Sequence, residues 1–160
     1  NPANPIIGNR SFGENKENVT QKAIAFTQGM QSEGVLANAK HFPGHGDTST
    51  DSHKALPVLD FDIERLDSIE LYPYKQLFKS NLASVMVAHL SVKSLESNDE
   101  MPTSLSYNVI TNLLQEQLNF KGLIITDALN MKGVSEYSKV KNIDLTAFIA
   151  GHDLLLISNN

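Results

Sequence analysis

The sequence contains no cysteine, which excludes a disulfide framework and a thiolate metal site. A chain without cysteine is compatible with both reducing and oxidising compartments. A cytoplasmic location and an exported one, periplasmic or lipoprotein, therefore both stay open.

Long hydrophobic runs are also absent. The longest, at residues 154–157, is flanked by polar residues and is far shorter than the roughly 20 residues of a membrane helix. We therefore expect no membrane span in this piece of chain. It opens with Asn1-Pro2-Ala3, without an initiator methionine or a charged and apolar leader, which indicates that upstream sequence is missing.

Basic residues are in deficit, with 13 Lys and Arg against 18 Asp and Glu and a formal net charge of -5. The acidic residues are scattered, so no basic face is available for a phosphate backbone, and we expect no nucleic acid partner. With 160 residues and 41% hydrophobic content, the chain is long enough for one domain or for one piece of a larger domain.

Apolar runs and amphipathic segments alternate along the chain. The runs predict strands, and the 3.6-residue periodicity predicts helices. Asp62 is the expected cap of the second helix, and Pro73 is expected to break or kink it. The predicted strands are residues 35–39, 84–88, 122–126 and 154–157, and the predicted helices are residues 17–33, 63–79, 109–118 and 143–150.

This alternation predicts an α/β fold with a parallel sheet, because parallel strands need crossover connections. A doubly wound sheet and a (β/α)8 barrel both satisfy the pattern. Long polar loops after several successive strands favour the barrel, whose C-terminal rim carries the functional loops. A complete barrel needs eight strands and about 250 residues. We therefore expect residues 1–160 to be a fragment of a single domain, a partial TIM barrel of about the last four to five β/α units.

The segment from Lys40 to His53 has the highest density of reactive side chains, with three of the five histidines beside two aspartates and a lysine. Asp51 and His53 are two residues apart, so the carboxylate can orient the imidazole and stabilise its protonated form. Because histidine titrates near neutral pH, this pair predicts proton transfer. The alternative is a solvated loop whose polar side chains cap local turns.

A metal site is a second chemical interpretation of this loop, since His41, His45, Asp47, Asp51 and His53 are all competent ligands. The first two histidines have the spacing of a helical zinc pair, but the Pro-Gly between them interrupts such a helix. The loop also lacks the lysine of a phosphate-binding motif. We therefore expect no metal and no cofactor.

Asp127 closes the strand at 122–126, where a barrel enzyme presents a carboxylate to its substrate, although a helix cap is the alternative role. A carboxylate facing a general acid across one cavity suits double displacement at an anomeric carbon, because one group attacks while the other protonates the leaving oxygen. Arg10, Lys40 and His41 are either donors to sugar hydroxyls or surface charges. His89 belongs either to the pocket rim or to the structural framework.

Four segments carry a recognisable pattern in their order and spacing. They are Asn4-Pro5-Ile6-Ile7-Gly8-Asn9-Arg10-Ser11-Phe12-Gly13, Lys40 to His53, Ile125-Thr126-Asp127-Ala128-Leu129-Asn130-Met131, and Ala150-Gly151-His152-Asp153-Leu154. Together they resemble the N-terminal barrel domain of glycoside hydrolase family 3, and most closely its β-N-acetylhexosaminidase branch. The second segment is a highly specific signature, and the four span almost the whole chain.

The resemblance implies a retaining enzyme that removes terminal non-reducing β-linked N-acetylglucosamine from peptidoglycan fragments or chitin-like saccharides, without a cofactor. It implies that Asp127 forms the covalent glycosyl-enzyme intermediate and that His53, supported by Asp51, is the acid/base on a mobile loop. Arg10, Lys40 and His41 would then hold the terminal sugar. A non-catalytic carbohydrate-binding relative and a metal-dependent hydrolase that uses the His/Asp loop are the alternatives.

An Asp-His dyad departs from the usual pair of carboxylates, and a neutral imidazole does not repel an anionic acceptor. Some members of the family are described as phosphorylases, so phosphate is a rival to water as the acceptor. The resemblance also implies that the barrel strands before Arg10, with an Asp that grips the sugar, are missing. We therefore expect the fragment alone to be inactive and its exposed strand edges to favour self-association.

Overall fold

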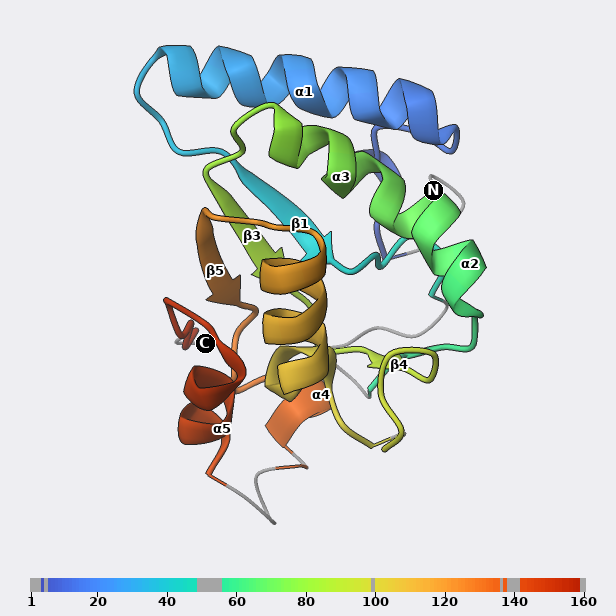
Figure 1. Ribbon diagram of the computed structural model, residues 1–160, viewed down its shortest axis with the longest axis vertical. Helices are drawn as coiled ribbons and strands as arrows, with labels where there is room; N and C mark the ends of the chain where they lie inside the picture. Colours follow the sequence, from blue (N-terminus) through green and yellow to red (C-terminus); the bar gives the residue numbers. More distant parts are fainter. Residues whose placement is uncertain are drawn as a thin grey trace.

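The computed structural model describes residues 4, 6–48, 56–98, 100–135, 137 and 142–158. It confirms an α/β chain with parallel strands (Figure 1). Helices α1 (Lys16–Ser32) and α3 (Leu71–Lys79) lie side by side at one end of the molecule, and α5 (Ile143–Ala150) lies at the other. Among the described residues, no helix is long and apolar enough to cross a membrane.

The main sheet has three parallel strands, β1 (Asn38–Phe42), β3 (Ser84–Val87) and β5 (Leu123–Thr126), in that spatial order. A parallel bridge between Ile125 and Leu154 continues the order beyond β5, and the strand predicted at 154–157 is reduced to this bridge. Successive strands of this sheet are therefore spatial neighbours. This order is the one that a barrel wall requires, and it also occurs within one half of a doubly wound sheet.

A second, two-stranded parallel sheet was not predicted from the sequence. It pairs β2 (Val58–Leu59) with β4 (Ser91–Val92), and the Ser91 N–H donates to the Pro57 carbonyl at 2.8 Å. Strands of two residues are too short to show a periodicity, so the sequence predicts only a loop at 91–106. The pairing joins the segment after β1 to the segment after β3.

Side-chain caps start three of the described helices, one of which the sequence predicts. Asp62 accepts a hydrogen bond from the Arg65 N–H at 2.7 Å, which confirms the predicted cap. Asn15 at α1 and Asn142 at α5 accept equivalent bonds at 2.9 and 3.1 Å, and satisfy amides that helix geometry leaves unpaired.

The remaining helical elements are the 3-10 helices η1 (Gly8–Arg10) and η3 (Thr103–Leu105), the π-helices η2 (Leu66–Glu70) and η4 (Asn108–Gln117), and the short α-helices α2 (Ile63–Arg65) and α4 (Lys132–Ser135).

The helical segment 63–79 does not break at Pro73, which lies within α3. The segment is irregular in the turn before the proline, where α2 widens into η2 and the Leu71 N–H donates to the Leu66 carbonyl. A proline removes one helical N–H and crowds the preceding turn, which is a known cause of such irregularity.

The first strand begins later than predicted, at residue 38 instead of residue 35. Val35 and Leu36 are 50% and 65% exposed and precede the sheet. Pairing with β3, which sets Asn38 opposite Ser84, decides this boundary. Such pairing cannot be detected in local hydrophobicity. As a result, His41 lies within β1.

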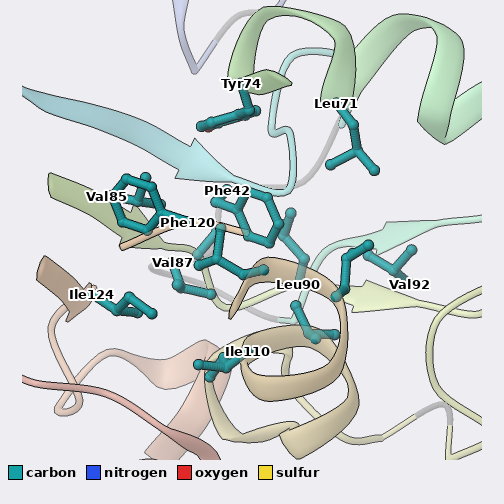
Figure 2. Packing of buried hydrophobic residues seen from close by; sticks show 14 of the residues in the cluster. Phe42, Leu71, Tyr74, Val85, Val87, Leu90, Val92, Ile110, Phe120 and Ile124 are labelled. Atoms are coloured by element: carbon teal, nitrogen blue, oxygen red, sulfur yellow. The ribbon is translucent and has the colours of Figure 1, made fainter. Parts of the chain in front are cut away.

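The main hydrophobic core lies between the sheet and the helices α3 and η4 (Figure 2). Phe42 at the end of β1 is fully buried, and its ring centroid is 5.1 Å from that of Tyr74 on α3. Val85 and Val87 of β3 are both fully buried beside them. Burial of such side chains stabilises the fold by about 1.5–3 kcal/mol each. The core therefore fixes β1 and β3 against α3.

A smaller hydrophobic cluster supports the segment after β5. Its buried members are Leu105, Leu129, Val134, Ile143 and Ala147. Because Leu129 follows Asp127 closely, this cluster anchors the chain where it leaves the sheet.

Gly122 precedes β5 where no side chain fits. An added Cβ would lie 2.4 Å from the Ala83 carbonyl oxygen and 2.6 Å from Phe120 Cζ. We expect Gly122→Ala to lower the free energy of unfolding by about 2 kcal/mol, because the overpacked backbone must move. Gly29→Ala is the matched control. It adds a Cβ with nothing within 4 Å inside α1 and should raise the free energy of unfolding by about 0.5–1 kcal/mol.

Urea denaturation followed by circular dichroism measures both changes. A Gly122→Ala variant as stable as the wild type would contradict the described packing of β5.

Candidate active site

Asp127 and His41 meet at the carboxyl ends of the main-sheet strands. Asp127 directly follows β5, and its N–H donates to the Val87 carbonyl at 3.0 Å. His41 is the second-last residue of β1, directly before Phe42. Because β1 and β5 run parallel on either side of β3, their carboxyl ends reach the same edge of the sheet.

The side chains of these two residues face each other. Asp127 Oδ2 is 3.5 Å from His41 Nε2, and the two side chains are 18% and 13% exposed. Asp127 Oδ1 accepts a hydrogen bond from the Ala128 N–H at 2.8 Å. The backbone thus holds one carboxylate oxygen while the other lies near the imidazole. Asp127 does not cap a helix, since α4 begins at Lys132.

His41 is neutral at neutral pH. Its pKa is lowered from 6.5 to about 4, chiefly because it is buried. Lys40, His45 and Arg10 also lower this pKa, whereas Asp127 raises it. A neutral imidazole is a hydrogen-bond donor that leaves the negative charge of Asp127 intact.

Arg10 and Lys40 bring positive charge to the same place from two different elements. Arg10 ends η1 and Lys40 lies in β1, and both residues are exposed. Both charges act on His41. Arg10 Nη2 donates to the Ile6 carbonyl at 2.9 Å, which ties the guanidinium to the turn before it. The structure therefore brings four of the sequence-predicted site residues together.

A cavity of about 650 Å³ extends from these residues along β1. This volume is within the range of small-molecule sites, about 300–1,000 Å³. Asp127 does not line the cavity, but it is within 3.5 Å of His41, which does. Its lining includes the polar residues Arg10, Lys40, His41 and His45 and the largely apolar residues Ala23, Phe26, Tyr74 and Leu77. The part of the cavity beside His41 is the candidate sugar site.

His45 is a site residue for which sequence reasoning found no role except metal binding. It is 6% exposed, and its ring centroid is 5.8 Å from that of His41 at an interplanar angle of 71°. His45 Nδ1 hydrogen-bonds to Thr48 Oγ1. Its position in the histidine-rich segment was the signal that pointed to it.

Arg65 connects the loop after β1 to the helices, and no motif predicted this. Its Nη2 is 2.6 Å from Asp47 Oδ2 and 3.0 Å from Glu70 Oε1. Burial raises the pKa of Glu70, and Arg65 opposes that rise. Gly44 packs directly on Glu70, because an added Cβ would lie 2.8 Å from Glu70 Cβ and Cγ. The loop is therefore attached to α2 through Arg65 and to η2 through Glu70.

His89 is a structural residue and not part of a pocket rim. It is fully buried, with Nδ1 2.6 Å from Ser104 Oγ and Nε2 3.0 Å from the Ala128 carbonyl. Since a carbonyl only accepts, Nε2 carries a proton and donates it to the Ala128 carbonyl. His89 thereby holds the peptide beside Asp127. His152 Nε2 donates to the Ser104 carbonyl at 2.9 Å, and burial lowers the pKa of His152 to about 4.

Asp51 and His53, the expected proton-transfer pair, lie outside the described residues, and their roles stay predictions. Within the described ranges, no group of three or more His, Cys, Asp or Glu side chains is arranged to hold a metal ion. His41, His45 and Asp47, three ligands of the metal interpretation, belong to those ranges.

Comparison with known proteins confirms the resemblance found in the four sequence segments. The profile described as "Glycosyl hydrolase family 3 N terminal domain" matches residues 1–160. The chain therefore belongs to glycosyl hydrolase family 3.

Its curated relatives are named β-hexosaminidases, which are glycosidases. The β-hexosaminidase of Actinobacillus pleuropneumoniae serotype 3 (strain JL03) is 40% identical over 154 residues, covering 96% of this chain and 44% of that protein. β-Hexosaminidase A of Pseudoalteromonas piscicida is 35% identical over 167 residues, covering 98% of this chain and 28% of that protein. The chain thus spans less than half the length of these relatives.

Two solved structures extend the comparison. The family 3 β-N-acetylglucosaminidase of Paenibacillus sp. str. FPU-7 is 41% identical with a TM-score of 0.94, and the match covers 100% of this chain and 30% of that one. The β-glucoside phosphorylase BglX is 30% identical with a TM-score of 0.93, with the same coverage of 100% and 30%. The described α/β chain therefore aligns along its whole length with family 3 catalytic-domain structures.

Two buried neutral histidines make the stability of the fold dependent on pH. His41 and His152 have folded-state pKa values of about 4, against 6.5 in the unfolded chain. Between these values the unfolded state binds protons that the folded state does not, so the free energy of unfolding falls as the pH falls from 6.5 to 4. The loss at pH 4 is about 3 kcal/mol for each histidine.

Urea titrations of wild type, His41→Gln and His152→Gln between pH 7 and pH 4 measure this dependence. In each variant the free energy of unfolding should fall less steeply with falling pH, by the contribution of the histidine that was removed. The carboxylates titrate in all three proteins, so their contribution cancels in the comparison. Identical slopes in all three proteins would contradict the low pKa values.

Proposed function

We propose that this chain is part of the catalytic domain of a retaining β-N-acetylglucosaminidase that removes terminal non-reducing β-linked N-acetylglucosamine. The geometry around Asp127 carries the proposal. This part-buried carboxylate follows β5 and is 3.5 Å from a neutral His41, which lines a cavity together with Arg10 and Lys40. Family membership and the names of the relatives supply the sugar class.

The proposed chemistry has two displacements. Asp127 Oδ2 attacks the anomeric carbon while His53, as imidazolium, protonates the departing glycosidic oxygen, giving a glycosyl ester and a neutral imidazole. The imidazole then takes a proton from water, and the oxygen of that water attacks the same carbon and releases the carboxylate. Asp51 orients His53 and stabilises its charged form. Two inversions give net retention.

Burial of His41 has a direct use in this mechanism. A protonated imidazole beside Asp127 would form an ion pair and lower the nucleophilicity of the carboxylate. Because the pKa of His41 is about 4, the ring is a neutral donor that can bind a sugar hydroxyl. Arg10 and Lys40 are the proposed charged donors to the same terminal sugar.

The remaining barrel is proposed to lie outside this chain. The parallel order of β1, β3 and β5 corresponds to consecutive strands of a (β/α)8 wall, of which residues 1–160 would supply the last four to five units. Coverage of 28% and 44% of the relatives supports a longer protein with further strands. We propose that it acts on peptidoglycan fragments or chitin-like saccharides.

Phosphate is the second candidate acceptor. A β-glucoside phosphorylase aligns with this whole chain at a TM-score of 0.93, so the same framework carries that reaction in a relative. After the first displacement, the neutral His53 would not repel a phosphate anion as a carboxylate would.

Aryl N-acetyl-β-glucosaminide assays on the full-length protein test the roles of Asp127 and His53. Asp127→Ala should lose activity by 10³-fold or more, because the nucleophile is gone. His53→Ala should lose far less with a nitrophenyl leaving group, which needs little protonation, and far more with an alkyl one. Glu116→Ala, on the exposed side of η4, is the surface control.

An inert wild type that still binds the sugar would favour a non-catalytic binding relative. Full activity in Asp127→Ala would reject the mechanism, and loss of activity with a chelator would support a metal-dependent hydrolase. Sugar 1-phosphate among the products in phosphate buffer would identify the phosphorylase reaction.

Exposed apolar side chains mark where further strands would pack. Phe148, Ile149 and Ile157 are 64%, 62% and 62% exposed near the β5 end of the sheet. We therefore expect the isolated chain 1–160 to self-associate and the full-length protein to cover this surface. Light scattering of the two proteins at equal concentration checks this. A strictly monomeric isolated chain that binds no hydrophobic dye would contradict it.

A further inference from the structure

Asn4 is a buried polar residue for which the proposed reaction provides no role. It is 4% exposed, and its side-chain amide Nδ2 donates to three backbone carbonyls of the loop after β1. The acceptors are His45 at 3.1 Å, Gly46 at 2.9 Å and Thr48 at 2.9 Å. One side chain thus holds a four-residue stretch of a loop that is more than 40 positions away in the sequence.

The side-chain oxygen of Asn4 is also hydrogen-bonded. Oδ1 accepts hydrogen bonds from the N–H groups of Ile6 at 2.8 Å and Ile7 at 3.2 Å, and the Asn4 carbonyl accepts from the Gly8 N–H at 2.8 Å. These bonds fix the side chain within its own turn, which leads into η1 and Arg10. Asn4 therefore fixes the turn before Arg10 and the loop after β1 in one relative position.

The loop stretch that Asn4 holds reaches the reacting carboxylate through two imidazole rings. His45 packs its ring against His41 at 5.8 Å between centroids, and His41 Nε2 is 3.5 Å from Asp127 Oδ2. Thr48 Oγ1 bonds to His45 Nδ1 and so sets the rotation of that ring. A shift of the His45–Thr48 backbone would therefore move His45 away from His41.

The same stretch has a second attachment on its other side. Asp47, which lies between the carbonyls that Asn4 binds, pairs with Arg65 at 2.6 Å. The carbonyls of the stretch are turned toward Asn4, whereas its carboxylate is turned toward α2. Arg65 binds the Asp47 carboxylate and not the carbonyls that Asn4 holds, so it does not replace Asn4.

We propose that Asn4 is a positioning residue of the active site: its amide holds the His45–Thr48 backbone so that His45 supports His41 beside Asp127. This inference rests on the proposed glycosidase function. Asn4 touches neither His41 nor Asp127 in the described contacts, so it acts through His45. Small displacements of supporting groups can reduce catalysis by about 10²-fold.

Asn4→Asp in the full-length protein is the direct test. The carboxylate keeps an acceptor for Ile6 and Ile7 but cannot donate to the three carbonyls. We expect kcat/KM for aryl N-acetyl-β-glucosaminide to fall by about 10- to 100-fold. Asn15→Asp is the matched control, since within the described part of the chain Asn15 accepts through its side-chain oxygen, as the cap of α1. Its activity should stay within about twofold, because aspartate caps helices as well as asparagine.

A double-mutant cycle with His45→Ala separates positioning from a general structural effect. If Asn4 acts through His45, Asn4→Asp should cost less than about threefold in the His45→Ala background. Thermal unfolding scans of every variant ensure that folded proteins are compared. If Asn4→Asp is insoluble, Asn4→Ala removes the donors without adding charge, and the same cycle applies.

Each outcome decides the proposal. Activity of Asn4→Asp within threefold of the wild type, or a full loss that persists in the His45→Ala background, overturns the role of Asn4 while leaving the glycosidase function intact. An inactive wild type overturns the glycosidase function itself. A large loss in Asn4→Asp that disappears in the double mutant supports the positioning role.

Discussion

Parallel pairing of β1, β3 and β5 is the constraint on which the site depends. Parallel strands deliver their carboxyl ends to one edge of the sheet, so residues far apart in the sequence, His41 and Asp127, come within 3.5 Å of each other. The core between the sheet and α3 keeps this edge rigid, because Phe42 next to His41 is fully buried against Tyr74. Phe42, which packs in the core, therefore directly follows His41, which contacts Asp127.

Burial then sets the electrostatics of the site. Removing His41 from water keeps it neutral although Asp127 raises its pKa, so no imidazolium pairs with that carboxylate. His89 bonds through Nε2 to the Ala128 carbonyl and so fixes the peptide that follows Asp127. The Ala128 N–H and His41 thus hold the carboxylate in position without an imidazolium beside it. The proposed nucleophile needs such a carboxylate.

Sequence reasoning was most successful where local signals are strong. The helix at 143–150, the Asp62 cap and the position of Asp127 at a strand end all follow from periodicity, capping chemistry and strand ends. It was less successful where the pairing of strands sets their bounds. Pairing with β3 starts β1 at residue 38 and not at the predicted residue 35, and the two-residue strands of the second sheet have no local signature.

Long-range contacts explain why parts of the site were also missed. Arg65 and Glu70 meet Asp47 only through the fold, and the role of Asn4 depends on carbonyls more than 40 residues away. The motif that contains Asn4 indicated the family, but not the hydrogen bonds that the asparagine makes. The histidine-rich segment drew attention to His41 as a site residue, but its contact with Asp127 appears only in the structure.

The central claim is that Asp127 becomes covalently bound to the sugar. An aryl N-acetyl-β-glucosaminide fluorinated on the ring slows both displacements, so a good leaving group lets the intermediate accumulate. Mass spectrometry of the full-length protein and of its peptic peptides then locates the added sugar. The account predicts one sugar per protein, attached to the peptide that contains Asp127. A label on another residue, or turnover of the aryl glycoside with no trapped adduct, would contradict it.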